Sequence, residues 1–346
     1  MVTATQSKPA ASQAVGRYSS SLGRLIRRPE AGSFLGMVAV FVFFSVIAGG
    51  AFLSAAGFSS WLNVAAEVGI VALPIGLLMI AGELDMSIGA VIPASSLCVA
   101  ITAGHFGAPE VVGIVLALGI GLLVGFVNGL LVLRTGVPSL IVTIGTMFAV
   151  MGLTLGFAVL LTGATSTPIV PSAVSMALFG QFVGGTFEIV IAWWLAFIAI
   201  MVLLLHVLPF GNWIYALGGD RVSARNAGIP TERLTIALFM ISGFCAAFLG
   251  VCQVMTYQTA QVVGGQSFIF NSIMCVVIGG VLLTGGFGSV VGIVIGTITF
   301  AVVNQAIYFT PFDPNFGSII IGGLLLAAVL MNDTFRQMAL AYSSKK

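Results

Sequence analysis

The sequence predicts an all-α polytopic membrane protein. Hydrophobic residues make up 59% of the chain and charged residues only 6%, whereas soluble domains carry about 25% charged residues. The apolar residues form runs close to the roughly 20 residues that cross a bilayer as a helix. The 44 glycines agree with helices that pack closely in lipid. We therefore expect about ten transmembrane helices in one bundle.

The apolar runs define the expected spans. They cover residues 34–54, 61–81, 87–103, 110–133, 138–161, 188–208, 234–257, 271–283, 289–309 and 316–331. Two or three runs are short, which predicts some short or broken helices. The whole permeation domain would then be 34–331, between a polar N-terminal segment, 1–33, and a tail, 332–346. The N-terminal segment is too long for the charged region of a cleavable signal peptide. The first span is therefore expected to be an uncleaved transmembrane helix.

The basic residues indicate the orientation of these spans. With ten spans and a cytoplasmic N-terminus, all twelve Lys and Arg residues fall on the cytoplasmic side. The expected outer loops, 55–60, 104–109, 162–187, 258–270 and 310–315, contain none. Cytoplasmic loops of membrane proteins carry an excess of Lys and Arg. We therefore expect both termini in the cytoplasm and an even number of spans.

Residues 210–233 form the one long internal stretch that is both polar and basic. Its sequence is FGNWIYALGGDRVSARNAGIPTER, with three arginines and several small residues that allow close approach of a partner. Pro230 is expected to end the segment before the next span. The stretch is interpreted as a cytoplasmic docking loop, and a merely solvated connector is the alternative.

A weak internal repeat suggests two inverted halves. Val127-Asn128 precedes Pro138 by the same spacing as Val303-Asn304 precedes Pro314. Gly-interrupted segments, 80–90 and 277–292, lie upstream of the two pairs. Five spans per half would give the halves opposite orientations, as in many transporters.

Polar residues inside apolar surroundings are candidates for function. Glu83 and Asp85 lie between two spans, where they are either solvated or part of a gate, and Glu67 lies within the second span. Intramembrane carboxylates need a partner or water; for Glu67 both proton coupling and pairing with a polar group are considered. At the outer end of the seventh span, Gln253, Tyr257, Gln258 and Gln261 form a polar cluster that suits either an entrance or the interface.

The sequence shows no motif of an enzyme. It lacks the Gly-x-x-x-x-Gly-Lys-Ser/Thr phosphate loop and any cysteine spacing typical of a metal site. A transporter without a phosphate loop needs either an ion gradient or a separate motor. We expect no cofactor or metal in this chain.

Four motifs resemble the permease subunits of bacterial ATP-binding-cassette importers for ribose, xylose, galactose and related sugars. They are GELDMSIG at 82–89, VPSLIVTIGTM at 137–147, YALGGD at 215–220 with the following Ala224 and Gly228-Ile229-Pro230, and VIGGVLLTGGFGSVVG at 277–292. The similarity runs in order from about residue 60 to 331. It implies a type II importer-like bundle.

The resemblance also implies partners and roles. The partners would be a cytoplasmic ATPase that uses ATP and Mg²⁺, a periplasmic or lipid-anchored sugar-binding protein, and a second permease copy or paralogue. The loop after the sixth span would insert into the ATPase as a coupling helix. Coupling residues would be Tyr215, Gly218, Gly219, Asp220, Arg221, Ala224, Arg225, Gly228, Ile229 and Pro230.

Two further groups of residues complete the expected site. Gate or structural residues would be Gly82, Glu83, Asp85, Ser87, Gly285, Gly286 and Gly288, and pathway residues would be Asn128, Phe148, Asn271 and Asn304. The chain departs from the family pattern at Asn271, often acidic, and at Val281, often a small hydroxyl residue. These departures suggest an unusual sugar, a polyol or a sugar-like signal. The alternatives are an ion- or proton-coupled secondary carrier and a membrane anchor or receptor that does not transport.

Overall fold

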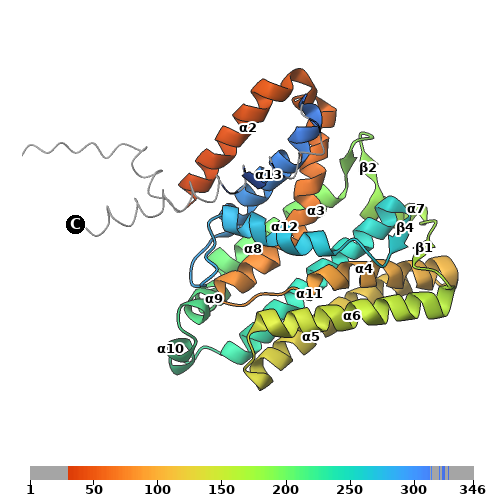
Figure 1. Cartoon of the computed structure of the whole chain (residues 1–346). Helices are drawn as coiled ribbons and strands as arrows, with labels where there is room; N and C mark the ends of the chain where they lie inside the picture. The colour runs from red at the N-terminus through yellow and green to blue at the C-terminus, as the bar shows by residue number, and fades with distance from the viewer. Residues whose placement is uncertain (1–29, 312, 314–318, 320–321, 324–325, 327–346) are drawn as a thin grey trace, which may run out of the picture.

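The computed structural model of the chain describes residues 30–311, together with 313, 319, 322, 323 and 326, as an α-helical bundle (Figure 1). The long helices are α2 (Ala31–Phe52), α3 (Ala55–Ile80), α4 (Ile88–Val99), α5 (Glu110–Thr135), α6 (Ser139–Thr162), α8 (Val190–Val202), α11 (Thr231–Tyr257) and α13 (Val290–Ala306). The shorter helices are α7 (Ala173–Ser175), α9 (Pro209–Gly219), α10 (Arg221–Asn226) and α12 (Gln266–Ile278). The π-helical turns η1 (Ala100–His105), η2 (Met176–Gly180) and η3 (Leu203–Val207) extend α4, α7 and α8, and the 3-10 turn η4 (Ile307–Phe309) follows α13.

Eight helices in the described part of the chain are long and apolar enough to cross a membrane. They coincide with eight of the expected runs, and the short helix α12 coincides with a ninth. The tenth run, 316–331, lies almost entirely outside the described residues, so the count of ten is not confirmed. The N-terminal residues 1–29 and the tail 332–346 lie outside them as well.

The start of α3 corrects one expected boundary. Residues 55–60 were expected to form an outer loop, but they are the first turns of α3. The hydroxyl of Ser54 accepts a hydrogen bond from the Gly57 N–H at 3.2 Å, which is the usual way a serine begins a helix. The run of apolar residues starts later than the helix because the first turns contain small and polar residues.

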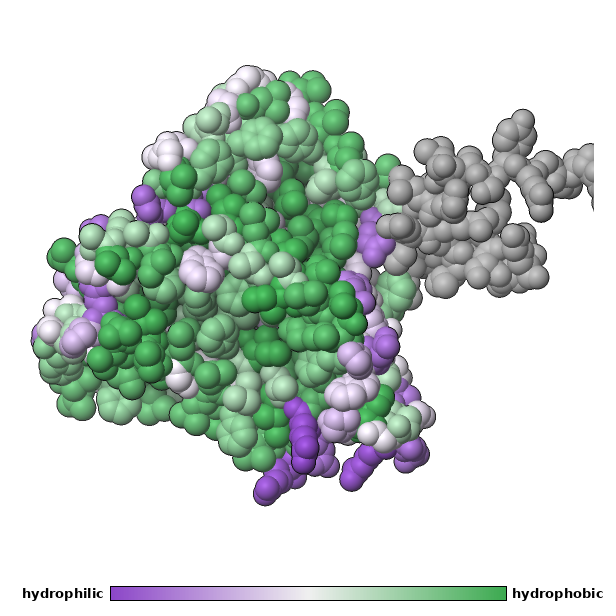
Figure 2. All heavy atoms as spheres, turned by 180° about the vertical axis from the view of Figure 1, so that it is seen from behind, coloured by the Kyte–Doolittle hydropathy of each residue, from purple (hydrophilic) through white to green (hydrophobic). Residues whose placement is uncertain are grey.

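The helices form an inner and an outer group. In α3, 83% of the most apolar 18-residue window is buried inside the bundle, whereas the corresponding share is 11% in α6. The corresponding windows of α4, α11 and α13 are also mostly buried, whereas less than a third of the window is buried in α2, α5 and α8. Figure 2 shows that hydrophobic side chains cover most of one face of the molecule. This arrangement fits a bundle whose outer helices face lipid.

Glycines allow the outer helix α5 to lie directly on the inner helix α11. A Cβ atom at Gly121 would collide with the backbone of Gly243, and one at Gly125 would collide with the carbonyl oxygen of Phe239. Small residues at such crossings let two helices approach closely in a membrane. Each additional carbon here would push the two helices apart.

The two ends of the bundle differ in their structure and charge. Two short antiparallel pairs, β1 (Ser166–Pro168) with β4 (Thr259–Gln261) and β2 (Phe182–Val183) with β3 (Phe187–Glu188), lie at one end. Helices α9 and α10 lie at the other end (Figure 1). The arginines of the described residues, Arg134, Arg221, Arg225 and Arg233, are on segments at the α9–α10 end, where Figure 2 shows hydrophilic side chains at the lower right.

The two Gly-rich turns lie together, which corrects one expectation about the repeat. The turn after α3 and the turn after α12 are joined by a hydrogen bond from the Gly286 N–H to the Ile80 carbonyl at 2.8 Å. Turns related by an inverted repeat would lie at opposite ends of the bundle. Segments 80–90 and 277–292 therefore give an inverted arrangement no support.

Candidate functional site

Three segments far apart in the sequence meet at the α9–α10 end. They are the turn 81–87 between α3 and α4, the end of α9, and the turn 279–289 between α12 and α13. The hydroxyl of Tyr215 on α9 donates a hydrogen bond to the Gly288 carbonyl at 2.7 Å. Three of the four motifs that suggested the family thus contact one another in space.

Glycines make this contact possible. A Cβ atom at Gly218 would collide with the Ile80 carbonyl oxygen and would lie 2.6 Å from the Gly286 nitrogen. Gly285, at φ +82°, has the Gly218 oxygen 2.8 Å and the Gly82 Cα 3.0 Å from its Cβ position. The neighbouring Gly219 differs, because nothing lies within 4 Å of its Cβ position. Gly218 is therefore a packing glycine, and Gly219 faces open space.

An ion pair links the turn after α3 to α10. The Arg221 guanidinium contacts the Glu83 carboxylate at 3.0 Å and donates a second hydrogen bond to the Thr235 hydroxyl on α11, also at 3.0 Å. The Glu83 side chain is only 10% exposed and that of Arg221 is 42% exposed. Glu83 is therefore not freely solvated. This differs from one of the two sequence-based alternatives, in which Glu83 was solvated. Arg221 connects three elements through one planar group.

Asp85 is the centre of a buried polar network. Its Oδ1 accepts hydrogen bonds from the Ser87 N–H at 2.9 Å and the Ser87 hydroxyl at 2.6 Å, and its Oδ2 accepts one from Ser242 at 2.8 Å. The amide of Asn128 donates to the Ser87 hydroxyl oxygen at 2.8 Å and accepts from Thr146 at 2.6 Å. Asp85 is 2% exposed and Asn128 is fully buried. Both side chains therefore tie helices together.

The same turn is also bonded to α6 through its backbone. The Leu84 N–H donates to the Ser139 hydroxyl at 3.0 Å, and the Met86 N–H donates to the Thr143 hydroxyl at 3.1 Å. The motifs at 82–89 and 137–147 are thus joined. Because an irregular turn has backbone donors that no helix satisfies, these hydroxyl groups replace the missing partners.

The expected docking loop at 210–233 is largely helical. Pro209 occupies the first turn of α9, where its missing N–H is not needed. The Asp220 carboxylate accepts a hydrogen bond from the Ser223 N–H at 2.6 Å and so begins α10. These bonds also lower the pKa of Asp220 below its ordinary value. Arg225 is exposed and lies 3.8 Å from the exposed Glu232.

Beyond α10, the segment turns toward α11. Gly228 has φ +83°, a left-handed conformation that favours glycine. Ala224 is buried, Ile229 is half-buried and Pro230 is exposed. Helix α10 therefore presents a mostly polar outer face, while Ala224 anchors it to the bundle.

The predicted pathway residues lie on four different helices. Asn128 on α5 belongs to the buried network, and Phe148 on α6 is 60% exposed. Asn271 on α12 and Asn304 on α13 are half-buried, and Asn304 accepts a hydrogen bond from its neighbour Gln305 at 3.0 Å. Val281, the other departure from the family pattern, is 3% exposed and packs in the core.

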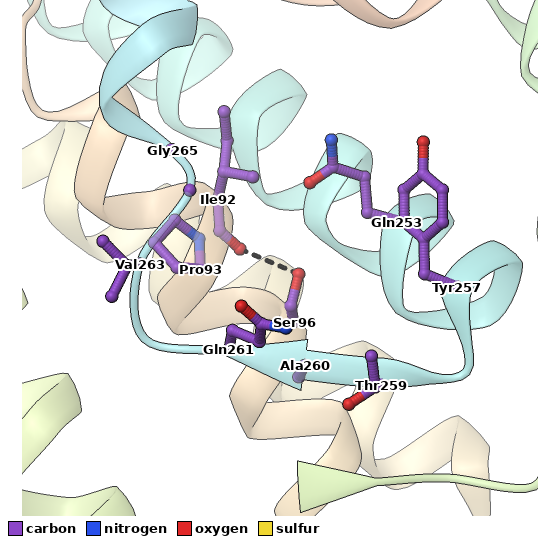
Figure 3. A pocket seen from close by; sticks show the side chains of 11 residues that line it. Ile92, Pro93, Ser96, Gln253, Tyr257, Thr259, Ala260, Gln261, Val263 and Gly265 are labelled. Atoms are coloured by element: carbon purple, nitrogen blue, oxygen red, sulfur yellow. Dashed lines mark hydrogen bonds between the residues drawn. The ribbon is translucent and has the colours of Figure 1, made fainter. Parts of the chain in front are cut away.

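A cavity of about 250 Å³ lies at the opposite end of the bundle, between α4, the end of α11 and residues 259–265 (Figure 3). Its wall includes Gln253, Tyr257 and Gln261 of the predicted polar cluster, and Ser96 of α4. The Glu67 carboxylate accepts hydrogen bonds from Gln253 at 3.2 Å and Tyr257 at 3.0 Å. Glu67 is therefore paired with polar groups of α11. In the part of the chain that the structure describes, no cluster of His, Cys, Asp and Glu could hold a metal ion.

Comparison with known proteins identifies the family. The family model described as branched-chain amino acid transport system / permease component matches residues 57–329. The chain belongs to this family of permease components. The permease is 30% identical to the fructose import permease protein FrcC of Rhizobium meliloti, over 90% of this chain and 87% of that protein.

Other relatives of the permease have similar lengths. The ribose import permease protein RbsC of Bacillus subtilis is 29% identical, with 87% of this chain and 92% of that protein covered. The probable ABC transporter permease protein YphD of Escherichia coli is 30% identical, with 91% and 93% covered. No solved structure matches. The permease is therefore a multi-pass membrane protein of a transport system.

Five hydroxyl residues that hold the motifs together were not among the predicted site residues. Ser139, Thr143, Thr146, Thr235 and Ser242 are hydroxyl residues inside apolar helices, and each bonds the turn after α3 or one of its partners. Hydroxyl residues are common in membrane helices, where they also bond their own backbone. Ser139, Thr143 and Thr146 do lie within the motif at 137–147, but nothing in the spacing of the five residues indicated which turn or side chain each would bond.

Proposed function

We propose that this chain is the membrane-spanning permease subunit of an ATP-binding-cassette importer for a small sugar or sugar-like molecule. The names of its relatives, which are import permeases for fructose and ribose, support the substrate class. A periplasmic or lipid-anchored binding protein would deliver the substrate. A separate cytoplasmic ATPase would supply the energy, using ATP and Mg²⁺.

The observation that carries the proposal is the packing of α9 on both Gly-rich turns. Each turn joins a helix that runs toward the α9–α10 end to a helix that runs away from it. Helix α9 therefore contacts two helical hairpins of the bundle at once. The Gly286–Ile80, Tyr215–Gly288 and Arg221–Glu83 contacts are the links. A force on α10 would pass through α9 and Arg221 to both turns, which is the arrangement that a separate motor needs.

The charges support one orientation of the bundle in the membrane. The α9–α10 end would face the cytoplasm because it carries the arginines of the described residues. The opposite end, with Glu67, Glu110 and Glu188, would face the binding protein. Both termini would lie in the cytoplasm of a bacterial inner membrane. A second permease copy or a paralogue would complete the pathway, because the exposed outer helices leave room for a partner.

Transport measurements in proteoliposomes test this proposal. Permease, ATPase and binding protein are reconstituted together, and uptake of radiolabelled D-fructose, D-ribose and D-xylose is followed with and without ATP. The expected result is uptake of at least one sugar that requires ATP and persists when a protonophore removes the proton gradient. An ATPase variant that lacks its phosphate-binding lysine serves as the control. Uptake by the permease alone, driven by a proton gradient, would contradict the proposal.

A further inference from the structure

The cavity at the strand-bearing end has a wall without charged side chains. Apolar groups of Ile92, Pro93 and Val263 form part of it, and uncharged polar groups form most of the rest. Its volume of about 250 Å³ lies below the roughly 300–1,000 Å³ typical of pockets for drug-sized ligands. The cavity therefore suits a small neutral molecule.

Three polar side chains in this wall donate hydrogen bonds within the protein. Tyr257 donates its hydroxyl proton to Glu67 Oε1, and Gln253 donates its amide N–H to Glu67 Oε2. The Ser96 hydroxyl donates to backbone carbonyls, with Gly250 at 2.8 Å. Each group keeps oxygen lone pairs that can still accept a hydrogen bond. The oxygens of Gln253 and Ser96 therefore offer acceptors in the cavity wall.

Glu67 fixes this arrangement. Gln253 and Tyr257 are four residues apart on α11, so their side chains lie on the same face of the helix. A carboxylate can only accept hydrogen bonds, so the nitrogen of the Gln253 amide must face it and the amide oxygen must face away. Figure 3 shows this oxygen turned toward Ile92, while the amide nitrogen and the Tyr257 hydroxyl point in another direction.

We propose that the cavity is a binding subsite for a neutral polyhydroxylated molecule, and that Glu67 is a positioning residue that makes Gln253 present its amide oxygen to the ligand's hydroxyl groups. The proposal rests on the proposed function and specifies which part of the permease recognises the substrate class. A sugar provides hydroxyl donors for the acceptors and C–H groups for the apolar wall. An anionic sugar would meet acceptor oxygens and would be disfavoured.

Saturation-transfer NMR on the full-length permease in lipid nanodiscs tests this subsite. The probes are D-ribose, D-fructose, a deoxyfluoro analogue of D-ribose whose fluorine cannot donate, and D-ribose 5-phosphate. We expect saturation transfer to a neutral sugar and little to the phosphate. The deoxyfluoro analogue should give a signal about three- to tenfold weaker than its parent, the loss expected for one hydrogen bond.

The variants separate positioning from a structural role. In Glu67→Gln, the new amide donates to Gln253, which turns and presents its N–H to the cavity. The signal ratio of deoxyfluoro analogue to parent sugar should then rise severalfold, whereas Glu67→Asp should keep the wild-type ratio. Tyr257→Phe removes the other hydrogen bond to Glu67 at a side chain that is 55% exposed and leaves the Gln253–Glu67 bond in place, so it should keep the wild-type ratio. Gln258→Asn, beside the cavity wall, should bind as the wild type does.

Two results would overturn the proposal. One is saturation transfer to D-ribose 5-phosphate that is at least as strong as the transfer to each neutral sugar. The absence of transfer to all of the sugars counts as the same result. The other is a ratio of deoxyfluoro analogue to parent sugar that stays unchanged in Glu67→Gln. ATP-dependent uptake in proteoliposomes would persist in either case, so failure of the subsite differs from failure of the proposed function.

Discussion

Asp85 shows how a carboxylate can be held inside a membrane bundle. Three hydrogen bonds from Ser87 and Ser242 satisfy both of its oxygens. Removing one partner of a buried charged group leaves the other unsatisfied, which costs more than the bond itself contributes. The Glu83–Arg221 pair is partly exposed, so its energy is modest. Its role in our account is geometric, because it fixes α10 to the turn.

Glu188 provides a prediction about pH. It precedes α8, is 8% exposed, and its Oε2 has no hydrogen-bond partner among the described residues. Burial and the nearby Glu67 carboxylate raise its pKa from 4.5 to about 7. Between these values the unfolded chain loses the proton while the folded protein keeps it, so stability falls as pH rises and then levels off above about 7.

The neutral variant Glu188→Gln should therefore have a higher Tm than the wild type at pH 8. The difference should be much smaller at pH 4.5, where the wild-type carboxyl is protonated in the folded protein and half protonated in the unfolded chain. Thermal unfolding in nanodiscs, followed by tryptophan fluorescence, measures it. The exposed Glu232→Gln is the control and should show no such pH-dependent difference. A Tm difference that is the same at both pH values would show that the Glu188 charge does not destabilise the fold.

At the scale of elements, the adjacent glycines of α9 have different roles. Gly218→Ala places a carbon against Ile80 and Gly286, and overpacking of this kind costs about 1–3 kcal/mol. Gly219→Ala adds a carbon in open space and replaces glycine by a better helix former. We expect a lower Tm for Gly218→Ala and an unchanged or slightly higher Tm for Gly219→Ala. Equal Tm values for the two variants would contradict the close packing of α9 on the turns.

The residues of the 210–233 segment were interpreted as a docking loop, and only the family resemblance implied a helix there, although the sequence contains local signals for both of its helices. Pro209 at a helix start and Asp220 three residues before Ser223 are local signals. The segment is too short and too polar to resemble a transmembrane span, so its hydropathy does not indicate a helix. Local capping signals were thus sufficient for α9 and α10, but hydropathy was not.

For the whole molecule, the apolar runs predicted most of the bundle. A span must bury about 20 residues in lipid, so its length is visible in the sequence. The contacts between helices were not visible. Asp85 and Ser242 are 157 residues apart in the chain, and nothing in one sequence pairs them. The two Gly-rich turns were matched as inverted repeats, yet they pack against each other at one end.

The central claim is that α9 and α10 receive the force that drives transport. Co-purification of the permease with its ATPase tests this most directly. Gly219→Trp places a large side chain on the open side of α9, where its Cβ atom would have nothing within 4 Å. Leu160→Trp, at an exposed position on α6 near the opposite end, is the matched control. We predict that Gly219→Trp inserts in the membrane and keeps its Tm but no longer retains the ATPase, while Leu160→Trp retains it. Equal retention of the ATPase by both variants would contradict the claim.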